Sequence, residues 1–122
     1  MCGGLAPIGD LTKKQVYELA RYYNSAAEII PQDIIDREPS AELRPNQKDQ
    51  DSLPPYDELD KAVVNIVEKS KKPTNETEKW LISKLVGTEF KRWQSAPILK
   101  ASSHSFGRGR RWPLAHKAFR KN

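Results

Sequence analysis

Apolar residues recur at helical spacing in four segments of the chain, and each segment is bounded by residues that typically cap or stop a helix. The first predicted helix covers residues 12–24. Thr12 is a favourable N-cap, and Gln15, three positions later, completes a capping box. One face of this helix carries its apolar positions, which are Val16, Leu19, Ala20 and Tyr23. The pattern predicts an amphipathic helix.

Two further helices are marked by prolines. Pro31 suits the first position of a short helix that runs to about Arg37, and Pro39 stops it. Pro55 begins a third helix, which we expect to reach about Ser70. The apolar face of this third helix consists of Leu59, Val63, Ile66 and Val67. This periodicity predicts that the third helix packs on a core.

A fourth helix opens with Asn75 and Glu78, which resemble an N-cap and its N3 partner. It is expected to run to about Gln94, with a bend at Gly87. Near the N-terminus, residues 5–8 have the character of a short strand. The predicted fold class of this chain is therefore mostly α.

Residues 39–57 separate the second and third helices and form a long polar loop with four prolines. Loops of this length without regular structure are uncommon in compact domains, and are usually functional lids or disordered segments. A solvated linker is the plain alternative. We expect the part from Arg44 to Ser52 to be mobile without ligands.

Charge divides the chain of 122 residues, whose formal net charge is +5. Residues 36–60 carry eight acids, whereas residues 97–122 carry seven lysines and arginines and no acid. Such a tail attracts anions, which can be nucleotide phosphates, nucleic acid or an acidic protein surface. No apolar run approaches the ~18 residues of a membrane span. The single cysteine fits a reducing compartment.

Catalytic motifs are not recognisable from residue types alone. His104 and His116 have no partners at the spacing of metal ligands. Gly107-Arg108-Gly109 lacks the context of a dinucleotide fingerprint. The loop acids are of the type that binds Mg²⁺, although a solvated acidic run is commoner. We therefore assign no catalytic residue and no metal ligand.

Three separated stretches resemble NAD synthetases of the long, glutamine-dependent form. They are LAPIGDLTKKQVYELA at residues 5–20, PSAELRP with DQDSLPPYDELD within residues 39–60, and EFKRWQSAP at residues 89–97. Because three stretches match in order and spacing, the resemblance is specific, and it extends from residue 3 to about residue 113. It implies that residues 1–122 are a C-terminal fragment of the synthetase domain. In that interpretation residues 39–57 are a mobile substrate loop and residues 97–122 a basic, largely irregular tail.

The resemblance also implies a fold and an activity. The complete domain would be an α/β adenine-nucleotide-hydrolase-like (ATP pyrophosphatase) domain. It would amidate deamido-NAD to NAD through an acyl-adenylate, releasing AMP and pyrophosphate, with ATP, Mg²⁺ and ammonia from glutamine. The family's SGGxDS-type phosphate loop, its acidic Mg²⁺ ligand and its glutaminase domain have no counterpart in these residues. We therefore expect the fragment to be inactive alone, cytoplasmic, and part of a homodimer or larger homo-oligomer.

Individual positions follow from the resemblance. Lys13 and Ser40 are similar to residues that bind ATP phosphates. Four positions are similar to residues that contact deamido-NAD: Asp49, Leu53, Lys91 and Arg111. Without the resemblance, Lys13 would be interpreted as a solvent-facing helix lysine, and Arg92, beside Lys91, as a solvated helix residue.

Two other classes of function remain open at this stage. A non-enzymatic helical module would bind nucleic acid or a partner through its basic tail, with Trp93 and Trp112 stacking on bases. A helical oligomerisation piece would associate through exposed apolar faces. The resemblance makes nucleic acid the weaker choice of partner.

Overall fold

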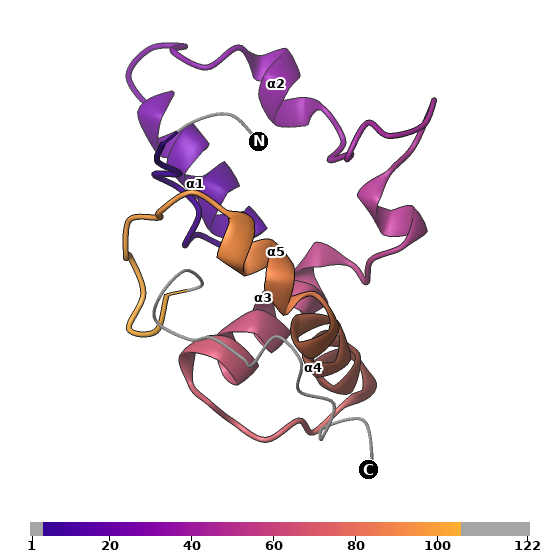
Figure 1. Cartoon of the computed structure of the whole chain (residues 1–122). Coiled ribbons are helices and arrows are strands. Elements are labelled where there is room, and N and C mark those ends of the chain that lie inside the picture. The colour runs from indigo at the N-terminus through magenta and orange to yellow at the C-terminus, as the bar shows by residue number, and fades with distance from the viewer. Residues whose placement is uncertain (1–3, 106–122) are drawn as a thin grey trace.

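The computed structural model describes residues 4–105, and this part of the chain is mostly helical (Figure 1). The elements in chain order are α1 (Lys13–Tyr23), α2 (Gln32–Asp36), the 3₁₀ turn η1 (Asp49–Asp51), α3 (Tyr56–Val63), the π-helical segment η2 (Val64–Glu68), α4 (Glu76–Gly87) and α5 (Glu89–Gln94). Between α2 and α3 the chain arches away from the other helices (Figure 1). No helix within residues 4–105 is long and apolar enough to cross a membrane.

Helix α1 begins as the sequence predicts. Thr12 Oγ1 accepts a hydrogen bond from the Gln15 amide at 3.4 Å, and Gln15 Oε1 accepts one from the Thr12 amide at 2.8 Å. A carboxylate from α3 also caps this end, because the Lys14 amide donates to Asp60 Oδ2 at 2.8 Å. No residue of α1 is fully buried: Val16, Leu19 and Ala20 are half-buried, and Tyr23 is 54% exposed. Among the helices within residues 4–105, α3 packs most closely on α1, and these residues cover the apolar side of α1 only in part.

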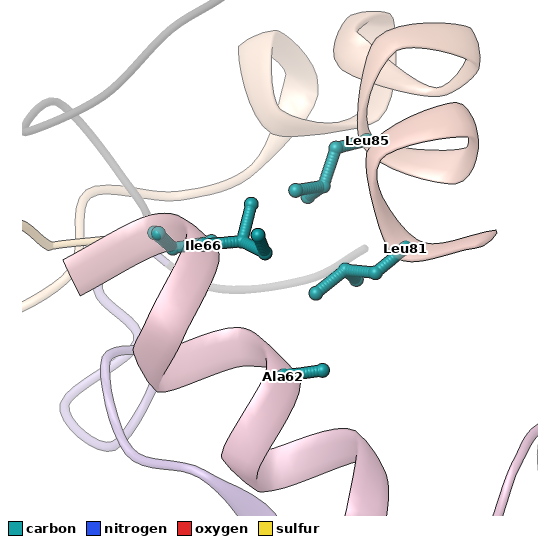
Figure 2. Close-up of a cluster of buried hydrophobic side chains, with 5 residues drawn as sticks. Ala62, Ile66, Leu81 and Leu85 are labelled. Atoms are coloured by element: carbon teal, nitrogen blue, oxygen red, sulfur yellow. The ribbon is translucent and has the colours of Figure 1, made fainter. Parts of the chain in front are cut away.

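The core lies between α3–η2 and α4. Its buried members are Ala62, Ile66, Val67, Leu81 and Leu85. Ala62 and Ile66 project from one helix toward Leu81 and Leu85 on the other (Figure 2). Partly buried side chains surround this cluster: Leu59, Val63, Trp80 and Ile82. The apolar faces predicted for the third and fourth helices are thus confirmed.

The third helix is not regular to its end. At Val64 the hydrogen bonding widens to a π-turn, in which the Lys69 amide donates to the Val64 carbonyl at 2.9 Å. This turn accommodates both Ile66 and Val67, sequence neighbours, in the core. Ser70 then adopts a left-handed conformation (φ 54°), which commonly ends helices. Periodicity alone does not distinguish such a widened turn from an α-helical one.

The predicted fourth helix is divided in two. Asn75 caps it as expected, accepting from the Glu78 amide at 2.9 Å. The backbone leaves the helical region at Thr88 (φ −118°, ψ 19°), one residue after the expected bend. Thr88 Oγ1 donates to the Lys84 carbonyl at 2.7 Å, and Arg92 Nη2 donates to the Leu85 carbonyl at 2.7 Å. The Lys84 carbonyl also keeps its backbone bond from the Thr88 amide at 2.9 Å, whereas Arg92 supplies a side-chain donor to the Leu85 carbonyl where α4 ends.

The predicted strand at residues 5–8 is reduced to one parallel bridge between Ala6 and Ile98. The Ala6 amide donates to the Pro97 carbonyl at 2.8 Å. Gly9 permits this approach, since a Cβ there would lie 2.5 Å from a methyl carbon of Ile98. Among the described residues there is no longer ladder, so the segment has the pairing of a strand at a single position.

A buried carboxylate reinforces the same junction. Asp10 is 3% exposed, and its Oδ2 accepts from the amides of Ala101 and Ser102, both at 2.7 Å. The Ser102 hydroxyl donates to the same oxygen at 2.9 Å. Asp10 therefore ties the start of the described chain to the segment after α5.

Candidate functional site

Lys13 occupies the first position of α1, and the next two amides of this helix are bonded to Asp60 and to Thr12. Its side chain is half-buried between two aromatic rings. Nζ lies 5.8 Å from the ring centroid of Tyr17 and 6.0 Å from that of Tyr56. Lys13 is therefore not the freely solvated helix lysine that its position alone suggests, because two rings hold its charge at the helix start.

Ser40 lies at the start of the long loop and shapes it. Its Oγ accepts a hydrogen bond from the Glu42 amide at 3.0 Å, and Glu42 adopts a left-handed conformation (φ 53°). Arg37 pairs with the Glu42 carboxylate at 2.5 Å. The Ser40 oxygen is thus used as an acceptor, and a serine hydroxyl in this role can still donate its proton to a ligand oxygen.

Lys13 and Ser40 line one open hollow, which we call the α1–α2 hollow. Its volume is about 380 Å³, within the range of about 300–1,000 Å³ that is typical of small-molecule sites. Its walls come from α1, α2 and the start of the loop: Lys13, Val16, Tyr17, Ala20, Ile30, Ile34, Ile35, Arg37, Glu38, Pro39, Ser40 and Glu42. Two residues far apart in the sequence, each resembling a phosphate-binding position, thus face the same space.

Asp49 begins the turn η1 and is joined to both ends of the loop. Its amide donates to the Pro39 carbonyl at 3.0 Å, and its carbonyl accepts from the Leu53 amide at 2.9 Å. Its carboxylate accepts a hydrogen bond from the Tyr56 hydroxyl at 2.5 Å. Asp49, Leu53 and Ser40, which follows Pro39, are therefore parts of one connected backbone arrangement.

Tyr56 is the residue of this site that the sequence prediction missed. Its hydroxyl meets Asp49 and its ring meets Lys13, so it lies between two positions that were predicted separately. Burial raises the pKa of the Tyr56 phenol, and the hydrogen bond to Asp49 raises it further. The sequence feature that points to Tyr56 is its position directly after Pro54-Pro55. This position makes it the first residue of α3 and places it beside the loop.

The loop contains hydrogen bonds and ion pairs of its own. Lys48 Nζ pairs with Glu38 Oε2 at 2.6 Å, and the hydrogen bond to Glu38 raises the pKa of the Lys48 ammonium. Residues 37–48 surround a second open hollow of about 650 Å³. These contacts define a shape for the loop, while its mobility stays a prediction.

Lys91 is placed apart from the residues above. It is exposed on α5 and lines neither of these two hollows. Its neighbour Arg92 is not the solvated residue that was expected: Arg92 pairs with the buried Glu89, whose other oxygen accepts from the Trp93 indole at 3.0 Å. Arg111 lies outside the described residues, as does most of the basic tail.

Glu78 belongs to the scaffold. It is 2% exposed, and its carboxylate accepts from the Asn65 amide group at 2.9 Å and from the Thr74 amide and hydroxyl at 2.7 and 2.9 Å. These bonds, the Thr74 amide foremost, hold the pKa of Glu78 below its ordinary value. Within residues 4–105 no three His, Cys, Asp or Glu side chains gather as metal ligands would. This part of the chain thus offers no built metal site.

Comparison with protein-family models matches residues 1–97 to the family described as NAD synthase. The chain is similar to curated proteins named glutamine-dependent NAD(+) synthetase. The Synechocystis protein is 48% identical over 123 residues, covering 94% of this chain and 22% of the relative. The Xanthomonas campestris and Aquifex aeolicus proteins are 42% and 41% identical, covering 95% and 98% of this chain and 23% of each relative.

No solved structure gave a significant match to the chain. The chain spans less than a quarter of the length of these curated relatives. The family match, in contrast, covers most of the chain and includes the three stretches on which the resemblance was based. The chain therefore belongs to the NAD synthase family.

Proposed function

We propose that this chain supplies part of the substrate-binding site of a glutamine-dependent NAD synthetase, an ATP-dependent ligase. The complete site would activate the nicotinate carboxylate of deamido-NAD as an acyl-adenylate, and ammonia from glutamine would then form the amide. The observation that carries this proposal is the meeting of Lys13 and Ser40 in the α1–α2 hollow. Its protein context would be an α/β ATP pyrophosphatase domain.

In this proposal Lys13 binds the phosphates of ATP. Its ammonium supplies the positive charge, since the amides of Lys14 and Gln15 at the start of α1 are already bonded to Asp60 and Thr12. The two tyrosine rings hold the ammonium without neutralising it. Ser40 would donate its hydroxyl proton to a phosphate oxygen from the other side of the hollow.

The loop would cover the second substrate. Asp49 and Leu53 would contact deamido-NAD on the nicotinate side, and Lys91 and Arg111 would contact it from residues outside the α1–α2 hollow. Closure of a polar loop excludes water, which would otherwise hydrolyse the mixed anhydride. In this proposal residues 4–105 bind the substrates and shield them from water, and no catalytic group is assigned among them.

Mg²⁺ would accompany ATP in the proposed reaction, with its protein ligands mostly outside this fragment. Within residues 4–105 no three His, Cys, Asp or Glu side chains gather. We assign no step to the metal here. The fragment is expected to be inactive by itself, because Lys13, Ser40 and Lys91 cannot alone stabilise the charge on transferring phosphates.

Large apolar side chains remain exposed on the first two helices and on the connector between them. Ile29, Ile34 and Tyr22 are 67%, 64% and 73% exposed, so large apolar side chains of α1, α2 and their connector face solvent. Such surface favours association, and we propose a homodimer or larger homo-oligomer. The single cysteine supports a cytoplasmic location, where thiols stay reduced.

Titration of ATP into the purified chain, followed by calorimetry at low ionic strength, tests the proposal. Lys13→Gln keeps the helix and removes the charge, so ATP affinity should fall about tenfold or more, as expected for loss of a charged hydrogen-bonding partner. Lys14→Gln is the matched control, since Lys14 is exposed and contributes its backbone amide to the Asp60 contact.

Equal affinities of the two variants would refute the role of Lys13. A second arm measures deamido-NAD binding, which Lys91→Ala should weaken while Lys84→Ala, on the exposed side of α4, should not. NAD formation by the chain alone with ATP, Mg²⁺, deamido-NAD and ammonia would contradict the expectation that the fragment is inactive.

A further inference from the structure

We propose that Tyr56 is a positioning residue, whose hydroxyl fixes the loop carboxylate of Asp49 and whose ring contacts the Lys13 ammonium. The inference rests on the proposed function, because it deepens the roles given there to Lys13 and Asp49. Nothing in the resemblance assigns a role to this tyrosine. Its hydroxyl and its ring serve different partners, and the two contacts can be tested separately.

The hydroxyl contact shapes the loop. The Tyr56 phenol donates to Asp49 Oδ2 at 2.5 Å, a charge-assisted hydrogen bond of the stronger type. The Asp49 amide is bonded to the Pro39 carbonyl, so the far part of the loop is drawn back to its beginning. One oxygen of the carboxylate is thereby occupied and its rotamer is set, while the second oxygen can accept from a substrate.

The ring contact faces the helix start. Tyr56 is the first residue of α3, and Lys13 is the first residue of α1. Asp60, one turn along α3, caps the α1 backbone, so the two helix starts are held together. The Tyr56 ring therefore reaches Lys13 from a fixed base, at 6.0 Å from Nζ.

Together these contacts arrange the loop before a substrate arrives. Binding to a pre-shaped loop costs less conformational entropy than binding to a loop that must first order. Removal of the hydroxyl alone should release Asp49 while the ring still covers Lys13. Tyr56→Phe is therefore expected to weaken binding of deamido-NAD and to leave binding of ATP unchanged.

Limited proteolysis with an endoproteinase that cleaves before aspartate reads the loop directly. In the wild-type chain the peptide bond before Asp49 lies at the start of η1, which the Tyr56–Asp49 hydrogen bond holds in place. The peptide bond before Asp60 lies inside α3, so its cleavage serves as an internal reference for global unfolding. Tyr56→Phe should speed cleavage before Asp49 about tenfold relative to cleavage before Asp60. Tyr22→Phe, at an exposed position of α1, is the control and should change neither rate.

Addition of deamido-NAD separates this inference from the proposed function. Protection of the Asp49 bond by deamido-NAD in the wild type, reduced in Tyr56→Phe, supports both. A second outcome is faster cleavage before Asp49 in Tyr56→Phe without ligand, but no protection of this bond by deamido-NAD in the wild type. That outcome supports the positioning role of Tyr56 and contradicts the substrate role of the loop. Equal ratios of the two cleavages in wild type, Tyr56→Phe and Tyr22→Phe would overturn the inference, as would a parallel rise in both cleavages.

Discussion

Ile66→Ala removes the most buried large apolar side chain of the core, one that is 2% exposed and packs against Leu81 and Leu85 (Figure 2). The change deletes three carbon atoms. Their transfer free energy amounts to about 2.4 kcal/mol at about 0.8 kcal/mol each. The cavity left behind adds to this, because α3–η2 and α4 cannot fully close over it, and we expect a total loss of about 3–4 kcal/mol.

This loss is a large part of the total free energy of unfolding expected for a small domain. Small domains are typically stable by about 5–15 kcal/mol, and the described core here contains few buried apolar residues. Urea unfolding followed by far-ultraviolet circular dichroism measures the change in the free energy of unfolding. Tryptophan fluorescence, to which Trp80 at the edge of the core cluster contributes, supplies a second probe of the same transition.

Ile29→Ala is the matched control, because the same three carbons are removed at a position that is 67% exposed. Its effect should stay within about 0.5 kcal/mol. If both variants lost the same stability, the α3–η2 and α4 interface would not be the main source of stability, and the assignment of the core would be wrong.

Three further predictions concern single contacts. Glu78 has a lowered folded-state pKa, so its stabilising contribution is present above its ordinary pKa of 4.5 and is lost as pH falls below it; Glu78→Gln should flatten the acid limb of a stability–pH curve. Tyr56 has a raised pKa, so its contribution is present below its ordinary pKa of 10.0 and is lost as pH rises above it; Tyr56→Phe should reduce that alkaline loss in urea titrations. Asp10→Asn should speed hydrogen exchange at the Ala101 and Ser102 amides, and unchanged exchange there would show that the carboxylate does not hold this segment.

Local features of the structure were largely predictable. The caps at Thr12 and Asn75 and the apolar faces of the third and fourth helices depend on neighbours within one or two turns, and these are visible in the sequence. Departures arise where distant contacts compete with local preference. Where α4 ends, the Arg92 side chain donates to the Leu85 carbonyl, and periodicity carries no sign of this contact.

The candidate site divides in the same way. Lys13, Ser40 and Asp49 were predicted from separate stretches of sequence. In the fold Lys13 and Ser40 line one hollow, and the Asp49 amide is bonded to the Pro39 carbonyl, next to Ser40. Tyr56 was not predicted, because a tyrosine at the start of a helix has no distinctive sequence pattern. Its role becomes visible only from its contacts with the Asp49 carboxylate and the Lys13 ammonium.

The sequence by itself determined the helical character, the positions of the caps, the polar loop and the family, since all of these are written in local order and spacing. Tertiary structure alone decided which polar groups are buried and paired. Asp10, Glu78 and Glu89 are each at most 3% exposed, although carboxylates usually remain in water. Folding brings Ala101 and Ser102 to Asp10 and Asn65 to Glu78, whereas Glu89 is bonded to Arg92 and Trp93 within its own helix. The physical reason is that a carboxylate can leave water only where donors replace its hydration, and the positions of those donors are set by the fold.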